Sequence, residues 1–118
     1  MKILVVDDSL LLRNIIKNEL SFEGYDIVAE AKDGQEAIEK YNSNKPDLVT
    51  MDITMDGMNG LDAAEKILQD DPQAKIIMVS ALGEDEVMSK AVRIGVKDFI
   101  VKPFTPERLI NAVKKALS

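Results

Sequence analysis

The sequence predicts a doubly wound α/β fold, a three-layer sandwich in which helices cover both faces of a five-stranded parallel sheet. Short runs of apolar, largely β-branched residues recur along the chain, as expected for strands that are buried on both faces. Amphipathic segments of helical length separate these runs, which is the pattern of consecutive βαβ units. Right-handed crossovers with one reversal of winding then favour the strand order 2-1-3-4-5, a known order for sheets of this kind.

The predicted strands follow one another at regular intervals, and four of the five end in a polar residue. In chain order they are residues 3–6, 27–29, 48–51, 76–79 and 99–101. The second is the shortest and has polar flanks, as an edge strand would. The first strand runs into Asp7 and Asp8, the third into Asp52, the fourth into Ser80 and the fifth into Lys102.

The first two predicted helices have clear boundaries. One runs from Ser9, a candidate N-cap, to about Glu23, and the other starts after Asp33–Gly34 and ends before Lys45–Pro46. Helical spacing predicts that one face of each points to the core. The inward residues are expected to be Leu12, Ile15, Ile16 and Leu20 in the first helix, and Ala37, Ile38 and Tyr41 in the second.

The last three helices also carry start or stop signals. The third follows Asn59–Gly60, and the fourth covers about residues 85–94, with Gly95 as its stop. The fifth starts with Thr105 as its cap and Pro106 at the first helical position. Their inward residues are expected to be Leu61, Ala64 and Leu68, then Val87, Ala91 and Ile94, then Leu109, Ile110, Val113 and Leu117.

The length of 118 residues suits one domain, which we expect to span residues 1–118. Hydrophobic residues make up 46% and charged residues 31% of the chain, an ordinary balance for a globular protein. The apolar runs fall far short of the roughly 20 residues of a membrane helix. Asp7 and Asp8 interrupt the first run too early for a signal peptide. We therefore expect a cytoplasmic protein with no membrane insertion.

Two residue types that often carry chemistry are missing from the sequence. It has no cysteine, which excludes disulfides, thiolate nucleophiles and cysteine-ligated metals. It has no histidine, so no imidazole can act as a base, bind zinc or carry a phosphoryl group. The remaining metal chemistry uses oxygen ligands, which favours Mg²⁺, with Mn²⁺ as the second choice. The net charge of −6 argues against nucleic acid as a partner.

The polar residues after the strands are expected to gather at one edge, because the carboxyl ends of parallel strands meet there. Three carboxylates at one place repel one another, which raises their pKa values or requires a cation. Mg²⁺ held by one or two carboxylates and the backbone carbonyl of Thr54 would relieve this repulsion. Lys102 can hold a phosphoryl oxygen with its charge, and Ser80 can hydrogen-bond another. Singly, each residue could be an ordinary surface or filler residue; their coincidence on four strands predicts a site for a cation and a phosphoryl group.

Four motifs together resemble the receiver domain of two-component response regulators. They are Asp7–Asp8, Met51–Ile53 with Gly57 and Asn59–Gly60 beyond it, Val79–Ala81, and Val101–Phe104. The resemblance covers essentially the whole chain in the right order and spacing. Within the family it is strongest for the stand-alone chemotaxis receivers. It implies the flavodoxin-like form of the doubly wound fold and a single receiver domain over residues 1–118.

The resemblance also implies roles for the acidic residues. Asp52 would accept a phosphoryl group from a histidine on a partner kinase. Asp8 and Asp52, with the Thr54 carbonyl, would ligate Mg²⁺, and Asp7 would act mainly through water.

Further roles follow from the resemblance for residues near the last two strands. Ser80 and Lys102 would hold the phosphoryl oxygens, and the Lys102–Pro103 peptide bond would be cis. Phe99 would be the switch aromatic, which turns inward when Ser80 moves toward the phosphate. Because Phe99 stands in place of a tyrosine, packing alone must drive its movement. Asp56 stands where the family often has proline, which bears on the metal affinity and rigidity of its loop.

The implied function is a signalling switch that catalyses only its own phosphorylation and dephosphorylation. Phosphorylation would reshape the surface formed by the fourth helix, fifth strand and fifth helix. This monomer would thereby control its docking on an output protein such as a flagellar motor switch component, with a phosphatase as a further partner. A phosphorelay intermediate and a receiver fragment of a larger regulator remain open as alternatives.

Two functions from other classes share part of this pattern. A Mg²⁺-dependent phosphatase of the haloacid dehalogenase type also forms an aspartyl-phosphate, but its nucleophile lies on the first strand, with a second aspartate two residues later. The adjacent Asp7 and Asp8 do not match that spacing. A flavodoxin-like electron carrier needs a hydroxyl- and glycine-rich loop after the first strand, where these acids would repel the flavin phosphate.

Overall fold

The computed structural model describes residues 1–55 and 57–118, in which strands and helices alternate; Asp56, where the sequence departs from the family pattern, falls outside them. The strands are β1 (Lys2–Val6), β2 (Asp26–Ala31), β3 (Leu48–Met51), β4 (Ile76–Ser80) and β5 (Asp98–Val101). The helices are α1 (Leu10–Phe22), α2 (Gly34–Asn44), α3 (Gly60–Asp70), α4 (Asp85–Ile94) and α5 (Pro106–Leu117). None of the described helices is long and apolar enough to span a membrane.

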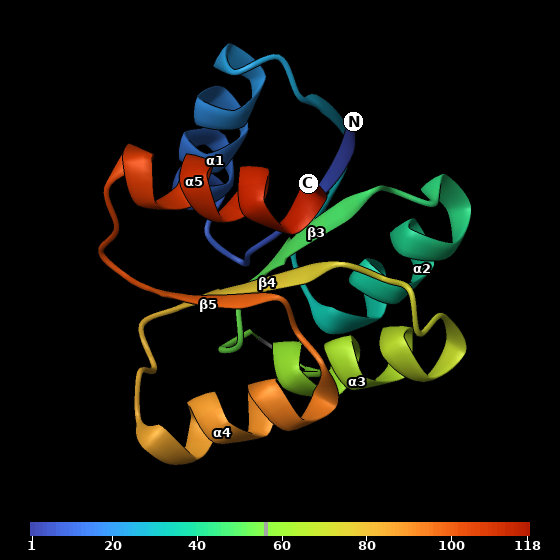
Figure 1. Ribbon diagram of the computed structural model, residues 1–118. Helices are drawn as coiled ribbons and strands as arrows, with labels where there is room; N and C mark the ends of the chain where they lie inside the picture. Colours follow the sequence, from blue (N-terminus) through green and yellow to red (C-terminus); the bar gives the residue numbers. More distant parts are fainter. Residues whose placement is uncertain (56) are drawn as a thin grey trace.

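The five strands form one parallel sheet in the order β2-β1-β3-β4-β5. Figure 1 shows α1 and α5 on one face of this sheet and α2, α3 and α4 on the other. The predicted doubly wound fold and its strand order are therefore confirmed. Because all strands run the same way, every βα loop leaves the sheet at the same edge.

A hydrophobic core lies on each face of the sheet, because successive side chains of a strand point to opposite faces. In β1, Leu4 and Val6 pack toward α2, α3 and α4, whereas Ile3 and Val5 pack toward α1 and α5. All four side chains are at most 1% exposed. This two-sided burial explains why the strands read as continuous apolar runs rather than as alternating ones.

Four helices begin with a side-chain cap close to where the sequence predicts one. The cap residues Ser9, Asp33, Asn59 and Thr105 each accept a hydrogen bond from the backbone N–H three residues later, at 2.8–3.3 Å. These caps satisfy N–H groups that a helix start would otherwise leave unpaired. Glu84, which precedes α4, makes no side-chain cap bond.

The structure corrects several details of the predicted elements. β2 is twice as long as predicted, because it pairs with β1 along residues 26–31. Ile15 is 39% exposed rather than inward, since α1 buries the face that carries Ile16 and Leu20. In α3 the fully buried positions include Ala63 and Ile67, whereas Leu68 is only partly buried.

Candidate functional site

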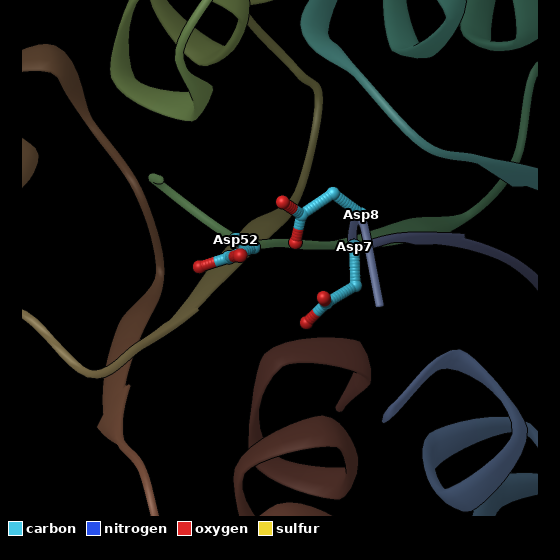
Figure 2. Close-up of side chains that lie close together, drawn as sticks. All are labelled: Asp7, Asp8 and Asp52. Atoms are coloured by element: carbon cyan, nitrogen blue, oxygen red, sulfur yellow. The ribbon is translucent and has the colours of Figure 1, made fainter. Parts of the chain in front are cut away.

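Two acidic segments follow neighbouring strands and meet at one edge of the sheet. β1 and β3 are parallel partners with Val6 opposite Met51, so the residues after them leave the sheet side by side. The Asp52 N–H donates to the Val6 carbonyl at 3.0 Å, which extends the ladder beyond the last residue of β3. Carboxylate oxygens of Asp7, Asp8 and Asp52 lie within 4.8 Å of one another. Figure 2 shows the three side chains gathered beyond the strand ends.

The three acids differ in their access to solvent. Asp7 is 1% exposed and Asp52 5% exposed, whereas Asp8 lies on the surface. Buried carboxylates are rare unless they are paired or bound to a cation. The site therefore has a buried base and one open side through which an ion or a phosphoryl group can enter.

Lys102 brings one positive charge to these acids from the end of β5. Its Nζ lies 2.7 Å from Asp7 Oδ2 and 3.6 Å from Asp52 Oδ1. The Lys102 backbone N–H also donates to the Ser80 carbonyl at 2.8 Å, which ties the end of β5 to that of β4. The ammonium is therefore positioned by the sheet itself and reaches two of the three carboxylates.

One ammonium does not balance three carboxylates. Burial raises the pKa of the Asp52 carboxyl to about 6; Lys102 opposes this shift, while Asp7 and Asp8 add to it. Such a pKa means that the ionised carboxylate is disfavoured where it stands, and a cation would remove that penalty. The available donors are all oxygen atoms, the ligand type that Mg²⁺ prefers. The residues present therefore fit a small divalent cation.

Asp7 is held by more groups than the other two acids. Its second carboxylate oxygen accepts a hydrogen bond from the Ser9 N–H at 2.9 Å. Its backbone carbonyl accepts one from the Arg13 guanidinium at 2.7 Å, and Arg13 is itself paired with Glu30 on β2. With one oxygen on Lys102 and the other on Ser9, Asp7 has less bonding capacity left for a cation than Asp8 or Asp52. Arg13 was not predicted as a site residue, because its only signal in the sequence is a basic residue one turn into the first helix.

Ser80 is the last residue of β4, where it pairs with Val101 of β5, and it is fully buried. Its hydroxyl oxygen accepts a hydrogen bond from the Leu82 N–H at 3.1 Å. The serine is thus at the predicted edge, but its side chain bonds the backbone of its own loop rather than the acids. A hydroxyl can still donate its proton to another acceptor while it accepts this bond.

The remaining predicted residues lie around this centre. Thr54 is exposed, two residues after Asp52. Phe99 is 9% exposed and packs in the core on the α2–α3–α4 face of the sheet, so its ring already points inward. The Lys102–Pro103 peptide bond is cis, as the resemblance implies. Asp7, Asp8, Asp52 and Lys102 are thus brought together directly, while the others occupy the adjoining loops and β5.

Comparisons with known proteins agree with this arrangement. A model of the response regulator receiver domain matches residues 3–114. The chain is similar to the chemotaxis protein CheY of Thermotoga maritima, with 48% identity over 114 residues that cover 97% of this chain and 95% of the relative. It is 49% identical to the chemotaxis protein CheY of Bacillus subtilis over 117 residues, which cover 99% of this chain and 98% of that one.

Solved structures show the same likeness in three dimensions. The crystal structure of the CheX–CheY–BeF3–Mg²⁺ complex from Borrelia burgdorferi matches with a TM-score of 0.97 and 34% identity, covering 100% of this chain and 90% of that one. The response regulator domain of Thermotoga maritima CheB matches with a TM-score of 0.86 and 36% identity, covering 98% and 92%.

Proposed function

Since this chain belongs to the response regulator receiver family, we propose that Asp52 accepts a phosphoryl group from a histidine of a partner kinase. The chain is a receiver of the CheY type, a phosphorylation-based switch of two-component signalling. The placement of Asp52 carries the proposal. Its carboxylate lies beside two further acids and one ammonium, at the open edge of the sheet.

In the proposed transfer, a carboxylate oxygen of Asp52 attacks the phosphorus of a phosphohistidine. A P–O bond forms as the P–N bond breaks, and the imidazole nitrogen leaves with the electron pair. The chain has no histidine of its own, so the donor must be another molecule. Transfer of this kind depends mainly on the positioning and neutralisation of charge.

The residues that would hold Mg²⁺ are Asp8, Asp52 and the backbone carbonyl of Thr54, with Asp7 acting through water. When bound, Mg²⁺ would neutralise negative charge shared between the carboxylates and the phosphoryl oxygens. The two bonds that already occupy Asp7 support its outer role. The similar Borrelia CheY forms a complex that contains Mg²⁺, which supports this choice of cation.

Lys102 and Ser80 would hold the phosphoryl oxygens. Phosphorylation replaces one negative charge on Asp52 with about two, and the Lys102 ammonium is already 3.6 Å from Asp52 Oδ1. The ammonium carries three N–H donors, so it would donate one hydrogen bond to a phosphoryl oxygen on Asp52 and weaken its bond to Asp7. Ser80 would donate its hydroxyl proton to another oxygen, while it keeps or releases the Leu82 N–H.

The proposed output is a change in the surface of α4, β5 and α5. Phe99 on β5 packs inward in the structure, so phosphorylation would stabilise this arrangement rather than create it. This is a population shift between two arrangements of one protein. Val92 on α4 and Val101 on β5 are exposed apolar residues that an output protein could cover. A flagellar motor switch component is the output partner that fits the CheY type.

The kinase would dock beside the site on α1. Leu10 and Leu11 are 61% and 69% exposed and begin two residues after Asp8, and the half-exposed Ile15 continues the same apolar surface. Exposed apolar side chains next to a reaction site favour an interface with another protein. A kinase helix seated there would bring its phosphohistidine to the open side of the three acids.

The direct test is incubation with acetyl phosphate and Mg²⁺, followed by intact-mass measurement. We expect one phosphoryl adduct, stable in acid and labile in base, on the wild type and none on Asp52→Asn. An unchanged adduct on Asp52→Asn would defeat the assignment of the phosphoacceptor.

The switch has a separate test. Output partners are recovered by pull-down with and without beryllofluoride, a mimic of the phosphoryl group. We expect stronger recovery in the mimic-bound state, and equal recovery in both states would contradict the proposed change of surface. A phosphatase partner, when added to the phosphorylated protein, would shorten the lifetime of the phosphoryl adduct that intact-mass measurement detects.

A further inference from the structure

Two glycines lie against the β3–α3 loop, whose described residues are 53–55 and 57–59, and both are required by space rather than by backbone conformation. Gly34 is the first residue of α2, and Gly60 is the first residue of α3. Neither has a positive φ, unlike Gly57 within the loop. An L-residue could therefore adopt both backbone conformations. Contacts with neighbouring atoms, rather than dihedral angles, exclude a side chain at these two positions.

Gly60 fixes one end of the loop against the phosphoacceptor residue. A Cβ atom at Gly60 would overlap the Asp52 carbonyl oxygen and lie 2.9 Å from the Ile53 Cα. The Gly60 N–H also donates to the Ile53 carbonyl at 2.8 Å. Since both neighbours are backbone atoms, this end of the loop is tied to the residue that follows β3.

Gly34 fixes the other end of the loop against α2. Its N–H donates to the Met58 carbonyl at 3.3 Å. A Cβ atom at Gly34 would lie 2.6 Å from that carbonyl oxygen and 2.9 Å from both Cβ and Cγ of Met58. Real Cβ atoms essentially never come so close, so any side chain at Gly34 must push Met58 away from α2.

The described part of the loop is also held by packing, because Ile53 and Met55, on either side of Thr54, are 5% and 8% exposed and lie in the hydrophobic core. Within the described part of the chain, its other backbone hydrogen bonds are the one at Gly60 and the bond from the Ala63 N–H to the Asn59 carbonyl, which starts α3. A Cβ atom at Gly57 would meet open space, and Thr54 is exposed. The position of the Thr54 carbonyl therefore depends on the packing of Ile53 and Met55 and on how the two ends of the loop are anchored.

We propose that Gly34 is a positioning residue for the cation site, which acts by letting α2 close on Met58 and so hold the β3–α3 loop in place. The inference rests on the proposed role of the Thr54 carbonyl as a Mg²⁺ ligand. Through this contact the start of α2 affects how well the loop presents that carbonyl. Mutation of a residue that orients a metal ligand without binding the metal itself typically lowers metal affinity by about 10–100-fold.

The wild-type protein tests this coupling by hydrogen exchange. If the contact between α2 and Met58 favours Mg²⁺ binding, saturating Mg²⁺ must favour the contact by the same factor. We expect the Gly34 amide to exchange about tenfold more slowly with Mg²⁺ than without it. The Lys45 amide, which donates to the Tyr41 carbonyl at the far end of α2, should not change. Equal exchange of Gly34 in both conditions would overturn the proposal.

A variant provides the second measurement. Gly34→Ala should weaken Mg²⁺ binding about tenfold in titration calorimetry. The matched control is Gly95→Ala: Gly95 has φ 102° at the end of α4, so alanine strains the backbone there, far from the loop. Both variants should lose stability in urea, but only Gly34→Ala should lose Mg²⁺ affinity. Unchanged affinity in a folded Gly34→Ala, or equal weakening in both variants, would overturn the proposal.

The two proposals fail in different ways. If the wild type binds no Mg²⁺, the proposed cation site fails. If the wild type binds Mg²⁺ but the Gly34 amide is indifferent to it, the cation site stands and only the role of Gly34 fails. If Gly34→Ala does not fold, the exchange measurement on the wild type decides.

Discussion

The ammonium of Lys102 lies 2.7 Å from Asp7 Oδ2, although the two residues are 95 positions apart in the sequence. The same nitrogen is 3.6 Å from Asp52 Oδ1. When all groups are ionised, three carboxylates and one ammonium leave this edge with an excess of two negative charges. The buried charge of Asp7 is compensated by its pair, whereas the buried Asp52 lies farther from the ammonium and has a raised pKa, and Asp8 is exposed to solvent.

Removal of this ammonium should destabilise the protein. In Lys102→Met, Asp7 keeps a buried charge without its partner, and we expect a loss of about 3 kcal/mol in the free energy of unfolding. Asp7→Asn should cost much less, because it also removes repulsion from the other two acids. Urea unfolding in the absence of divalent ions measures both. A Lys102→Met protein as stable as the wild type would show that the pair does not compensate the buried charge.

Mg²⁺ should stabilise the wild type against heat. A ligand at one hundred times its Kd adds about 2.7 kcal/mol to the stability of the folded state. Asp8→Asn removes a carboxylate from the exposed side of the site and should abolish most of this gain. The control Asp70→Asn changes an acid that pairs with Lys66 on the surface of α3, and it should keep the full gain. Thermal unfolding with and without Mg²⁺ checks this, and an equal gain in both variants would exclude Asp8 as a ligand.

The pair of Asp98 and Arg108 should make stability depend on pH. Arg108 donates to both carboxylate oxygens at 3.1 Å, and this bonding lowers the pKa of Asp98 below its ordinary value of 3.8. A pKa that is lower in the folded state contributes stability above the unfolded value, and that contribution is lost as pH falls through the folded pKa. Because the Arg108 side chain is 45% exposed, we expect only about 0.5–1 kcal/mol at neutral pH.

Urea unfolding of Asp98→Asn and the wild type over a range of pH tests this pair. The difference in stability should be present at neutral pH and vanish in acid, below the folded pKa of Asp98. Arg108→Met should show the same loss, and the double variant should lose little more than either single variant. Additive losses would mean that the two side chains act independently.

The apolar surface of α1 should matter for the kinase and not for the chemistry. We expect Leu11→Ser to lower kcat/KM for phosphotransfer from the cognate histidine kinase about tenfold, the loss expected if Leu11 is one of the few interface residues that contribute more than about 1 kcal/mol. Its rate with acetyl phosphate should not change, since that donor needs no docking surface. Phe22→Ser is the matched control, because Phe22 is exposed at the far end of the same helix. Equal effects on both donors would place the defect in the site itself.

The sequence predicted the backbone elements well where a strand is buried on both faces or a helix ends at a glycine. Residues 48–51 and 85–94 were predicted to be a strand and a helix, and β3 and α4 have these bounds. β2 was predicted too short, because this edge strand carries the polar residues Asp26 and Glu30 and is only partly buried along most of its length, which weakens its apolar signal. The inward position predicted for Ile15 was wrong, since helical spacing shows which residues share a face but not how wide a face the neighbouring elements cover.

Part of the candidate site could also be predicted from the sequence, and part could not. Asp7, Asp8, Asp52 and Lys102 could be predicted to meet because each follows a strand of one parallel sheet. The contacts of Arg13 with the Asp7 carbonyl and of Gly34 with Met58 left no recognisable pattern in the sequence, since each joins segments that are adjacent only after the helices pack. The roles predicted for Ser80, Thr54 and Phe99 stay predictions until the phosphorylated state is measured.

The amino-acid sequence by itself determined the order of the strands and the edge at which the polar residues collect, because connectivity and two-sided burial leave few other ways to wind this chain. Only the tertiary structure decided that Lys102 sits closer to Asp7 than to Asp52, that Asp8 stays open to solvent, and that Phe99 points inward. The two distances from the Lys102 ammonium differ by less than an ångström. Such distances, and the exposure of Asp8 and Phe99, are set by how the side chains of several elements pack together, which no single segment encodes.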